Sequence, residues 1–269
     1  MKNKIFYIVS IVLLPAMLLI NETADAQKDS TTLYDLPFRS SELKAGFNIL
    51  GSSSVCLPVK GGIYDASLGA WLISPESKMS IINFDYNMAD TSLIFAACKD
   101  SSSIVLLKGK SNSGSSYIQK RFGTLPAGNC FISVVGNDSF FAWHYDREFS
   151  SIYLFSDSQH LLLQTKDTIT AFYPAGSTAF LFAVNKKLYS LTAGDAPKLF
   201  TVFDDIIDGI AQNDSGSLIV STQKGIYTFT GNSKKIVLLT NETHGYLRAW
   251  SNSLYVFDRS RNKIVQFGL

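Results

Sequence analysis

The sequence predicts an all-β fold, a β-propeller of about six four-stranded blades. Hydrophobic residues make up 46% of the chain and aromatic residues 13%, a composition that suits packed, pleated sheets. From about residue 48 onward, short apolar runs alternate with turn residues, and no helical periodicity extends over about a dozen residues. The arrangement of runs recurs about every 40 residues, which is the length of a propeller blade.

Individual strands are predicted where apolar runs lie between turn sequences such as Gly-Asn-Asp-Ser and Asn-Asp-Ser-Gly. Short strands at this spacing are typical of a sandwich, a barrel or a propeller. The clearest runs lie at 93–97, 104–107, 131–135, 140–143, 152–155, 161–163, 179–184, 188–191, 218–220, 226–229, 236–239 and 254–257.

A repeat favours the propeller among these folds. When 180–191 is aligned with 218–229, Tyr189 and Tyr227 fall 38 residues apart, and Tyr153 lies 36 residues before Tyr189. Each unit ends in a further short apolar run, so that four strands fit in about 40 residues. Two tandem sandwiches remain an alternative.

The last unit offers three apolar runs, at 246–250, 253–257 and 263–267. We therefore expect an N-terminal strand, within 47–57, to complete this sheet and close the ring. Closure of this kind removes the exposed strand edge that a linear stack of blades would leave.

The N-terminus has the pattern of a secretory signal peptide at 1–26. Lys2 and Lys4 precede an apolar run at 5–20, and Ala-Asp-Ala at 24–26 is a cleavage pattern. A membrane anchor is the alternative, but the run is shorter than the roughly 20 residues of a spanning helix. We therefore expect an exported protein that is periplasmic, envelope-associated or secreted, with no transmembrane segment after cleavage.

The remainder of the chain is predicted to contain a loose lead-in at 27–46 and a single propeller domain at 47–269. The net charge is +2 with interspersed signs, so no nucleic-acid partner is expected. Cys56, Cys98 and Cys130 allow at most one disulfide, and their apolar contexts favour buried thiols. Whether any pair is bridged stays open.

One segment, 209–229, resembles a regulator-type propeller repeat. The shared features are an acidic turn that ends at Gly216, an apolar strand, Thr222, and a Gly-Ile-Tyr sequence that ends at Tyr227. Ile219 stands where that family usually has Trp. The family occurs in exported sensor regions of bacterial two-component proteins, and the resemblance, which covers one blade, implies the propeller fold.

Candidate binding residues lie in the loops that a propeller presents on one face, namely the loops between second and third strands and those between blades. Functional residues favour such loops on a rigid scaffold. Trp143 and Tyr246 are further candidates, as anchors for a partner. The alternative is that the loop residues belong to ordinary solvated turns and that the aromatic residues belong to the core. The candidates are His144, Asp146, Arg147, Glu148, Asp204, Asp205, His244, Trp250, Arg259 and Arg261.

The pattern favours a non-enzymatic binding or scaffold module in the cell envelope, because no catalytic motif is assembled; no cofactor is predicted. Its partner is expected to be a protein or a carbohydrate. The alternative is a metal-dependent hydrolase, lactonase-like enzyme or lyase, whose cation would be held by oxygen ligands at the channel mouth. Asp146, Asp204 and Asp205 are the candidate ligands. A structural subunit of an envelope assembly is a third possibility.

Overall fold

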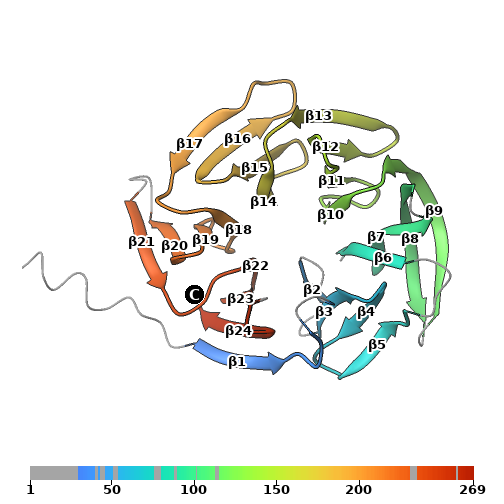
Figure 1. Ribbon diagram of the computed structural model, residues 1–269, viewed down its shortest axis with the longest axis horizontal. Helices are drawn as coiled ribbons and strands as arrows, with labels where there is room; N and C mark the ends of the chain where they lie inside the picture. The colour runs from blue at the N-terminus through green and yellow to red at the C-terminus, as the bar shows by residue number, and fades with distance from the viewer. Residues whose placement is uncertain are drawn as a thin grey trace, which may run out of the picture.

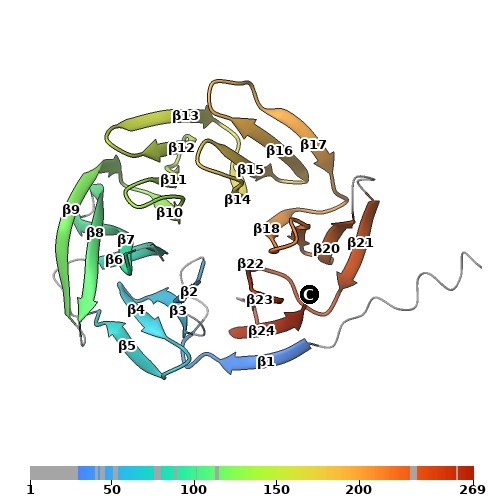
Figure 2. The same ribbon diagram turned by 180° about the vertical axis from the view of Figure 1, so that it is seen from behind.

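The computed structural model describes residues 30–39, 42, 46–50, 54–75, 80–87, 90–100, 102–112, 115–230, 235–258 and 260–269. These residues form 24 strands in six four-stranded sheets and contain no helix. The sheets are arranged in a ring, each with one strand toward the centre (Figures 1 and 2). The predicted six-bladed β-propeller is therefore confirmed. No described segment is a helix long and apolar enough to cross a membrane.

Each blade is an antiparallel sheet of four strands that lie side by side in order from the centre of the ring to its rim (Figure 1). Blade 1 contains β2 (Asn48–Leu50), β3 (Ser54–Val59), β4 (Gly62–Asp65) and β5 (Ala70–Ile73). Blade 2 contains β6 (Ser80–Asn87), β7 (Ser92–Asp100), β8 (Ser103–Asn112) and β9 (Ser115–Pro126). Blade 3 contains β10 (Asn129–Val134), β11 (Phe140–Tyr145), β12 (Ser150–Phe155) and β13 (Gln159–Thr165).

The second half of the ring follows the same plan. Blade 4 contains β14 (Ile169–Pro174), β15 (Ala179–Val184), β16 (Lys187–Thr192) and β17 (Lys198–Val202). Blade 5 contains β18 (Ile207–Gln212), β19 (Leu218–Thr222), β20 (Gly225–Thr230) and β21 (Lys235–Thr240). Blade 6 contains β22 (Tyr246–Trp250), β23 (Ser253–Asp258), β24 (Lys263–Gly268) and, at the rim, β1 (Ser30–Asp35).

The rim strand of blade 6 comes from the N-terminal part of the chain. β1 pairs antiparallel with β24, and an ion pair of 3.4 Å joins Asp35 to Lys263. The strand that completes this sheet thus lies at 30–35, and its predicted place within 47–57 is wrong, because that segment forms β2 and β3. Part of the predicted loose lead-in is therefore a paired strand, which is mostly polar because it lies at the rim. The predicted signal peptide, 1–26, lies outside the described residues.

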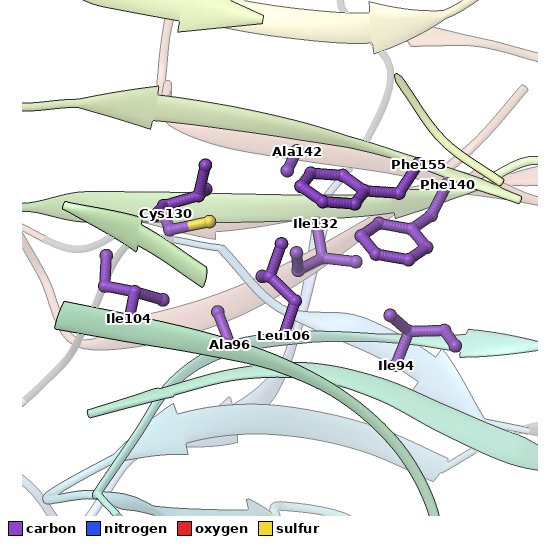
Figure 3. Packing of buried hydrophobic residues seen from close by; sticks show 10 residues of the cluster. Ile94, Ala96, Ile104, Leu106, Cys130, Ile132, Phe140, Ala142 and Phe155 are labelled. Carbon is purple, nitrogen blue, oxygen red and sulfur yellow. The ribbon is translucent and has the colours of Figure 1, made fainter. Parts of the chain in front are cut away.

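Among the described residues, six clusters of buried apolar side chains hold the ring together, one at each junction between neighbouring blades. At the junction of blades 2 and 3, Ile94 and Leu106 pack against Ile132 and Phe140 (Figure 3). Another cluster, which includes Phe257, joins blade 6 to blade 1. Because both faces of each sheet are covered, the strands read as continuous apolar runs.

A repeated bulge shapes the rim strand in four blades. The extra residue on the fourth strand is apolar in each case and packs toward the core: Leu72, Leu162, Phe200 and Leu239. Opposite it, the register shifts at Ile63/Tyr64, Ile152/Tyr153, Leu188/Tyr189 and Ile226/Tyr227. The tyrosines of the sequence repeat thus occupy equivalent positions on the third strand, which explains why their spacing equals one blade.

The three cysteines are free thiols. Cys56 and Cys130 are buried, as predicted, and Cys98 is partly buried. Burial raises the pKa of the Cys56 and Cys130 thiols, so they serve as core residues.

Candidate functional site

A cavity of about 70 Å³ lies where the inner strands of the six blades converge, and we call it the narrow cavity. Its walls come from the first half of the inner strands, together with one side chain from β11. The lining residues are Gly46, Phe47, Asn48, Asn83, Phe131, Ile132, Ser133, Trp143, Ala171, Phe172, Asp208, Gly209, Ile210, Tyr246, Leu247 and Arg248.

Three aromatic residues form one wall of the narrow cavity, which we call the aromatic wall. Phe131 and Trp143 face each other across β10 and β11, and their rings are stacked with centroids 4.3 Å apart at 15°. Tyr246 extends the wall from blade 6, with its ring centroid 6.4 Å from that of Phe131. These rings offer a flat apolar surface with polar tips.

Two residues that line the narrow cavity each have a buried polar atom without a hydrogen-bond partner. The two atoms are Trp143 Nε1 and Asp208 Oδ1, and among the described residues no other side-chain atom is both buried and unpartnered. Trp143 is only 6% exposed. An unsatisfied buried polar atom costs about 1–3 kcal/mol. The wall of the narrow cavity therefore includes two residues that carry an unsatisfied polar atom, one a donor and one an acceptor.

Asp208 is held by a histidine of the neighbouring blade. His244, in the loop before β22, lies with Nδ1 2.7 Å from Asp208 Oδ2. The other carboxylate oxygen of Asp208 is the unpartnered one. The His244 contact therefore fixes the carboxylate while leaving one oxygen for a ligand.

Gly209 allows blades 5 and 6 to approach at this point. A Cβ on Gly209 would collide with the Gly245 carbonyl oxygen and would lie 2.9 Å from Leu247 Cγ. Any other residue would push the two inner strands apart. Glycine beside Asp208 thus lets the carboxylate reach His244.

Arg248 is the positively charged residue among those that line the narrow cavity. Its Nε donates to the Phe47 carbonyl oxygen at 3.2 Å, and Nη2 lies 3.9 Å from Asp85 Oδ1. Asp85 also accepts hydrogen bonds from the backbone N–H groups of Val134 and Tyr86. Burial raises the pKa of Asp85, and the charge of Arg248 acts in the opposite direction.

A second cavity, of about 380 Å³, lies further along the inner strands and is called here the wide cavity. Leu247 and Arg248 line both cavities, so the two cavities adjoin along β22. The lining residues are Val134, Val135, Tyr173, Pro174, Gly176, Ser177, Ala211, Gln212, Leu247, Arg248 and Ala249.

The loop between β11 and β12 supplies predicted site residues that serve the turn itself. Asp146 Oδ1 accepts hydrogen bonds from the backbone N–H groups of Glu148 and Phe149, both at 2.8 Å. Arg147 and Glu148 are exposed. His144 is 1% exposed, and its Nε2 lies 3.0 Å from the Pro126 carbonyl oxygen. His144 is therefore a core residue and not part of a loop at the channel mouth.

The predicted residues of blades 5 and 6 are spread over both ends of the molecule. Asp204 and Asp205 lie before β18, and Arg261 follows β23, at the end where the inner strands begin. Trp250 pairs with Ser253 at the opposite end of β22, so its placement on the same face is wrong. Arg259 lies outside the described residues. Of the predicted residues, Trp143 and Tyr246 line the narrow cavity, and His244 adjoins it through Asp208.

The acidic residues nominated as metal ligands do not assemble. Asp146 follows β11 in blade 3, whereas Asp204 and Asp205 precede blade 5. The described residues contain no group of three or more His, Cys, Asp or Glu side chains that could hold a metal ion.

Sequence reasoning missed Asp208, Arg248 and Asp85. Each is a charged residue inside an inner strand, where it interrupts an apolar run. Such interruptions are the available signal, because a charge in an otherwise buried strand must face either a partner or a channel.

The fold places this chain among six-bladed β-propeller proteins. It is similar to a gluconolactonase from Xanthomonas campestris, with 14% identity over 92% of this chain and 91% of the other, and a TM-score of 0.63. It is also similar to virginiamycin B lyase from Staphylococcus aureus, with 10% identity over 90% and 100% of the chains and a TM-score of 0.61.

A chain from a nidogen/laminin complex has 12% identity over 83% of this chain and 88% of the other, with a TM-score of 0.61. At these identities the likeness shows the fold alone. No protein-family model matches the chain, and no curated protein matches its sequence. The regulator-type character of 209–229, which spans β18 to β20, stays a prediction.

Proposed function

We propose that this protein is an exported, non-enzymatic binding module of the cell envelope whose narrow cavity holds the end of a carbohydrate. The observation that carries the proposal is that Trp143 and Asp208 line the same cavity and that each has a buried atom without a partner, the donor Nε1 and the acceptor Oδ1. A ligand that fills both roles removes two desolvation penalties at once.

A sugar hydroxyl suits these two atoms. A hydroxyl group both donates and accepts, so neighbouring hydroxyls can accept from the Trp143 indole and donate to the Asp208 carboxylate. The apolar C–H face of the ring can then lie against the aromatic wall. Because the narrow cavity measures only about 70 Å³, the ligand inserts one edge of a sugar unit rather than a whole oligosaccharide.

The indole N–H signals in a ¹H–¹⁵N NMR spectrum test this proposal. Glucose, galactose, mannose and N-acetylglucosamine are titrated in turn, and the Trp143 signal is assigned from Trp143→Phe. We expect at least one sugar to shift the Trp143 signal with saturation, while the signals of Trp71 and Trp250 stay in place. A Trp143 signal that none of the four sugars moves contradicts the proposal.

The acceptor is tested by Asp208→Asn. Losing the charged acceptor should weaken sugar binding about tenfold, since a hydrogen bond to a charged group contributes about 1.5–3 kcal/mol. Asp204→Asn, a change to an exposed acid before the same strand, is the matched control and should bind as the wild type does. Equal affinity in Asp208→Asn and the wild type would exclude a ligand at Oδ1.

An enzyme is the second candidate, and the hydrogen bond between His244 and Asp208 favours it. A carboxylate that holds one imidazole nitrogen orients the other as a general base. A gluconolactonase and a lyase are among the proteins of similar fold, and a His-to-Ala variant of that lyase is described as catalytically inactive. Glucono-1,5-lactone hydrolysis, followed by pH-stat with and without added CaCl₂, should then exceed the buffer rate and be lost in His244→Gln. A hydrolysis rate equal to that of buffer alone would exclude lactonase activity on this substrate.

A further inference from the structure

The wide cavity is a separate space from the narrow cavity and has a different chemical character. Its volume of about 380 Å³ falls within the range of small-molecule sites, about 300–1,000 Å³. Its lining is mixed, with Val134, Pro174 and Leu247 among the larger apolar side chains. The neutral polar groups of Tyr173 and Gln212 complete it.

Arg248 is the charged residue that lines the wide cavity, since every other lining residue is neutral. A guanidinium group has five N–H donors. Nε is used by the Phe47 carbonyl, and Nη2 faces Asp85, which leaves the two N–H groups of Nη1 without a protein partner in the described structure. Arg248 therefore retains donors for a ligand.

Asp85 neutralises Arg248 only in part. The shortest approach of the two groups is 3.9 Å, which is longer than a charge-assisted hydrogen bond of about 2.7–2.9 Å. Backbone N–H groups of Val134 and Tyr86 occupy the Asp85 carboxylate at 2.7 and 2.9 Å. Asp85 does not line the wide cavity, so the charged group in its wall is the Arg248 guanidinium.

Tyr173 places a hydroxyl donor in the wall of the same cavity. Burial raises the pKa of its phenol, the charge of Arg248 acts in the opposite direction, and the charge of Asp214 raises the pKa further. A carboxylate can accept hydrogen bonds from the Nη1 N–H groups of Arg248 and from the Tyr173 hydroxyl.

We propose that the wide cavity binds a small organic carboxylate, whose charged end contacts Arg248 and Tyr173 and whose apolar body lies against Val134, Pro174 and Leu247. This site is independent of the carbohydrate site proposed for the narrow cavity. Arg248 lines both cavities, and each cavity has polar groups that can bind a ligand.

Benzoate is the probe, and benzamide, which has the same shape without the charge, is its control. Ligand-observed NMR titrations at about pH 7 should show benzoate binding at least tenfold tighter than benzamide. Arg248→Gln should weaken benzoate binding at least tenfold, and Arg248→Lys by less, because lysine keeps the charge but loses the planar fork. Arg261→Gln, a change to an exposed arginine on the other face, should leave the affinity for benzoate unchanged.

Three further variants keep the test informative, since Arg248 also contacts Phe47 and Asp85. Tyr173→Phe should weaken benzoate binding severalfold. Ser177→Trp, at the exposed edge of the wide cavity, should block the cavity while Arg248 stays in place. Trp143→Phe should still bind benzoate, which separates this site from the narrow cavity. Equal binding of benzoate and benzamide, or unchanged binding in Arg248→Gln or Ser177→Trp, would overturn the proposal.

Discussion

At the scale of single residues, burial decides which polar groups are available for chemistry. His144 is a histidine in a predicted loop, yet its ring is buried and bonded to a carbonyl oxygen. Asp208 lies in an apolar run, yet it lines a cavity and one of its oxygens has no hydrogen-bond partner. Residue type alone does not distinguish these two cases, because the distinction depends on neighbours from other strands.

The pH dependence of stability should report the burial of His144. Burial lowers the pKa of His144, and its contact with the Pro126 carbonyl acts in the opposite direction. The unfolded chain, with a pKa near 6.5, therefore takes up a proton before the folded protein does as the pH falls. We expect the free energy of unfolding to fall between about pH 7.5 and 5.5, and to fall less in His144→Gln.

Urea unfolding at both pH values measures this difference. His160→Gln, a change to an exposed histidine, is the control and should show the wild-type fall. The prediction fails if His144→Gln and the wild type lose the same free energy of unfolding.

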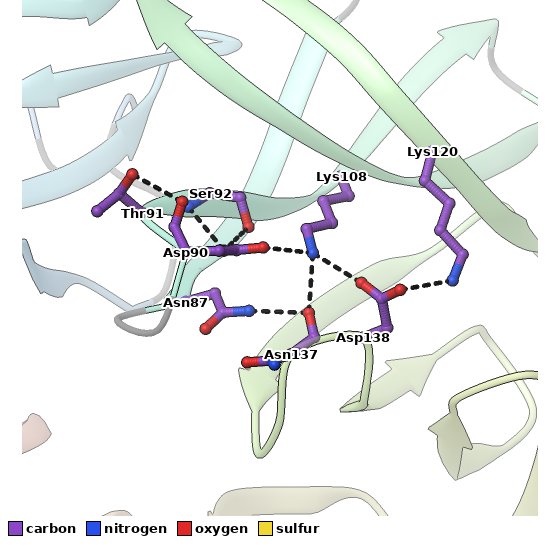
Figure 4. A network of polar contacts seen from close by, with 8 residues as sticks. All are labelled: Asn87, Asp90, Thr91, Ser92, Lys108, Lys120, Asn137 and Asp138. Carbon is purple, nitrogen blue, oxygen red and sulfur yellow. Dashed lines mark hydrogen bonds and ion pairs between the residues drawn. The ribbon is translucent and has the colours of Figure 1, made fainter.

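At the scale of elements, a polar network joins blade 2 to blade 3 alongside their apolar cluster (Figure 4). Lys108 Nζ contacts Asp90 at 2.6 Å, Asp138 at 2.7 Å and the Asn137 carbonyl oxygen at 2.9 Å. Lys120 contacts the second oxygen of Asp138 at 2.9 Å. The Lys108 side chain is 10% exposed, so it is the buried centre of this network.

Replacing this buried lysine should loosen the junction. Lys108→Met leaves Asp90 without its cation, and we expect a loss of about 1–3 kcal/mol in the free energy of unfolding. Lys120→Met, whose side chain is 40% exposed, should change it by less than about 1 kcal/mol. Urea unfolding of both variants checks this, and equal losses would contradict a buried centre at Lys108.

The same network should weaken in acid. Its lysine contacts lower the pKa of Asp138. At Asp90 burial acts to raise the pKa, but the contacts of Lys108 and the hydrogen bonds of Ser92 together lower it. The stabilisation by the network is thus present above the unfolded pKa of about 3.9 and is lost as the pH falls through the lowered values. Lys108→Met should accordingly lose less stability than the wild type below about pH 4.

The apolar and turn patterns of the sequence predicted the positions of most strands. The tyrosine spacing located equivalent third strands, because the same bulge and the same core contact recur in each of these blades. β1 was missed because a rim strand with exposed side chains lacks an apolar signature. Trp250 was misplaced because a short inner strand spans the whole depth of the ring, so its two ends lie on opposite faces.

At the scale of the whole molecule, stability depends on the junction between the last blade and the first. Leu36, just after β1, is 8% exposed and belongs to the cluster that joins blades 6 and 1. Leu36→Ala should cost about 2–5 kcal/mol. For a protein of this size that corresponds to a fall in Tm of at least about 4 °C.

Leu68→Ala is the matched control, since Leu68 is 75% exposed, and it should change Tm by less than about 2 °C. Calorimetry compares the two variants with the wild type. A Tm that is equally insensitive to both changes would mean that the junction contributes little to the cooperative unit.

The sequence by itself determined the all-β class, the six-blade repeat and the blade length. These follow from turn chemistry and apolar runs, which are local properties read along the chain. Only the tertiary structure decided the site. Trp143, Asp208 and Arg248 come from three different blades and meet because the ring brings the inner strands together. Whether each polar atom finds a partner there depends on residues far away in the sequence, and no local pattern records that.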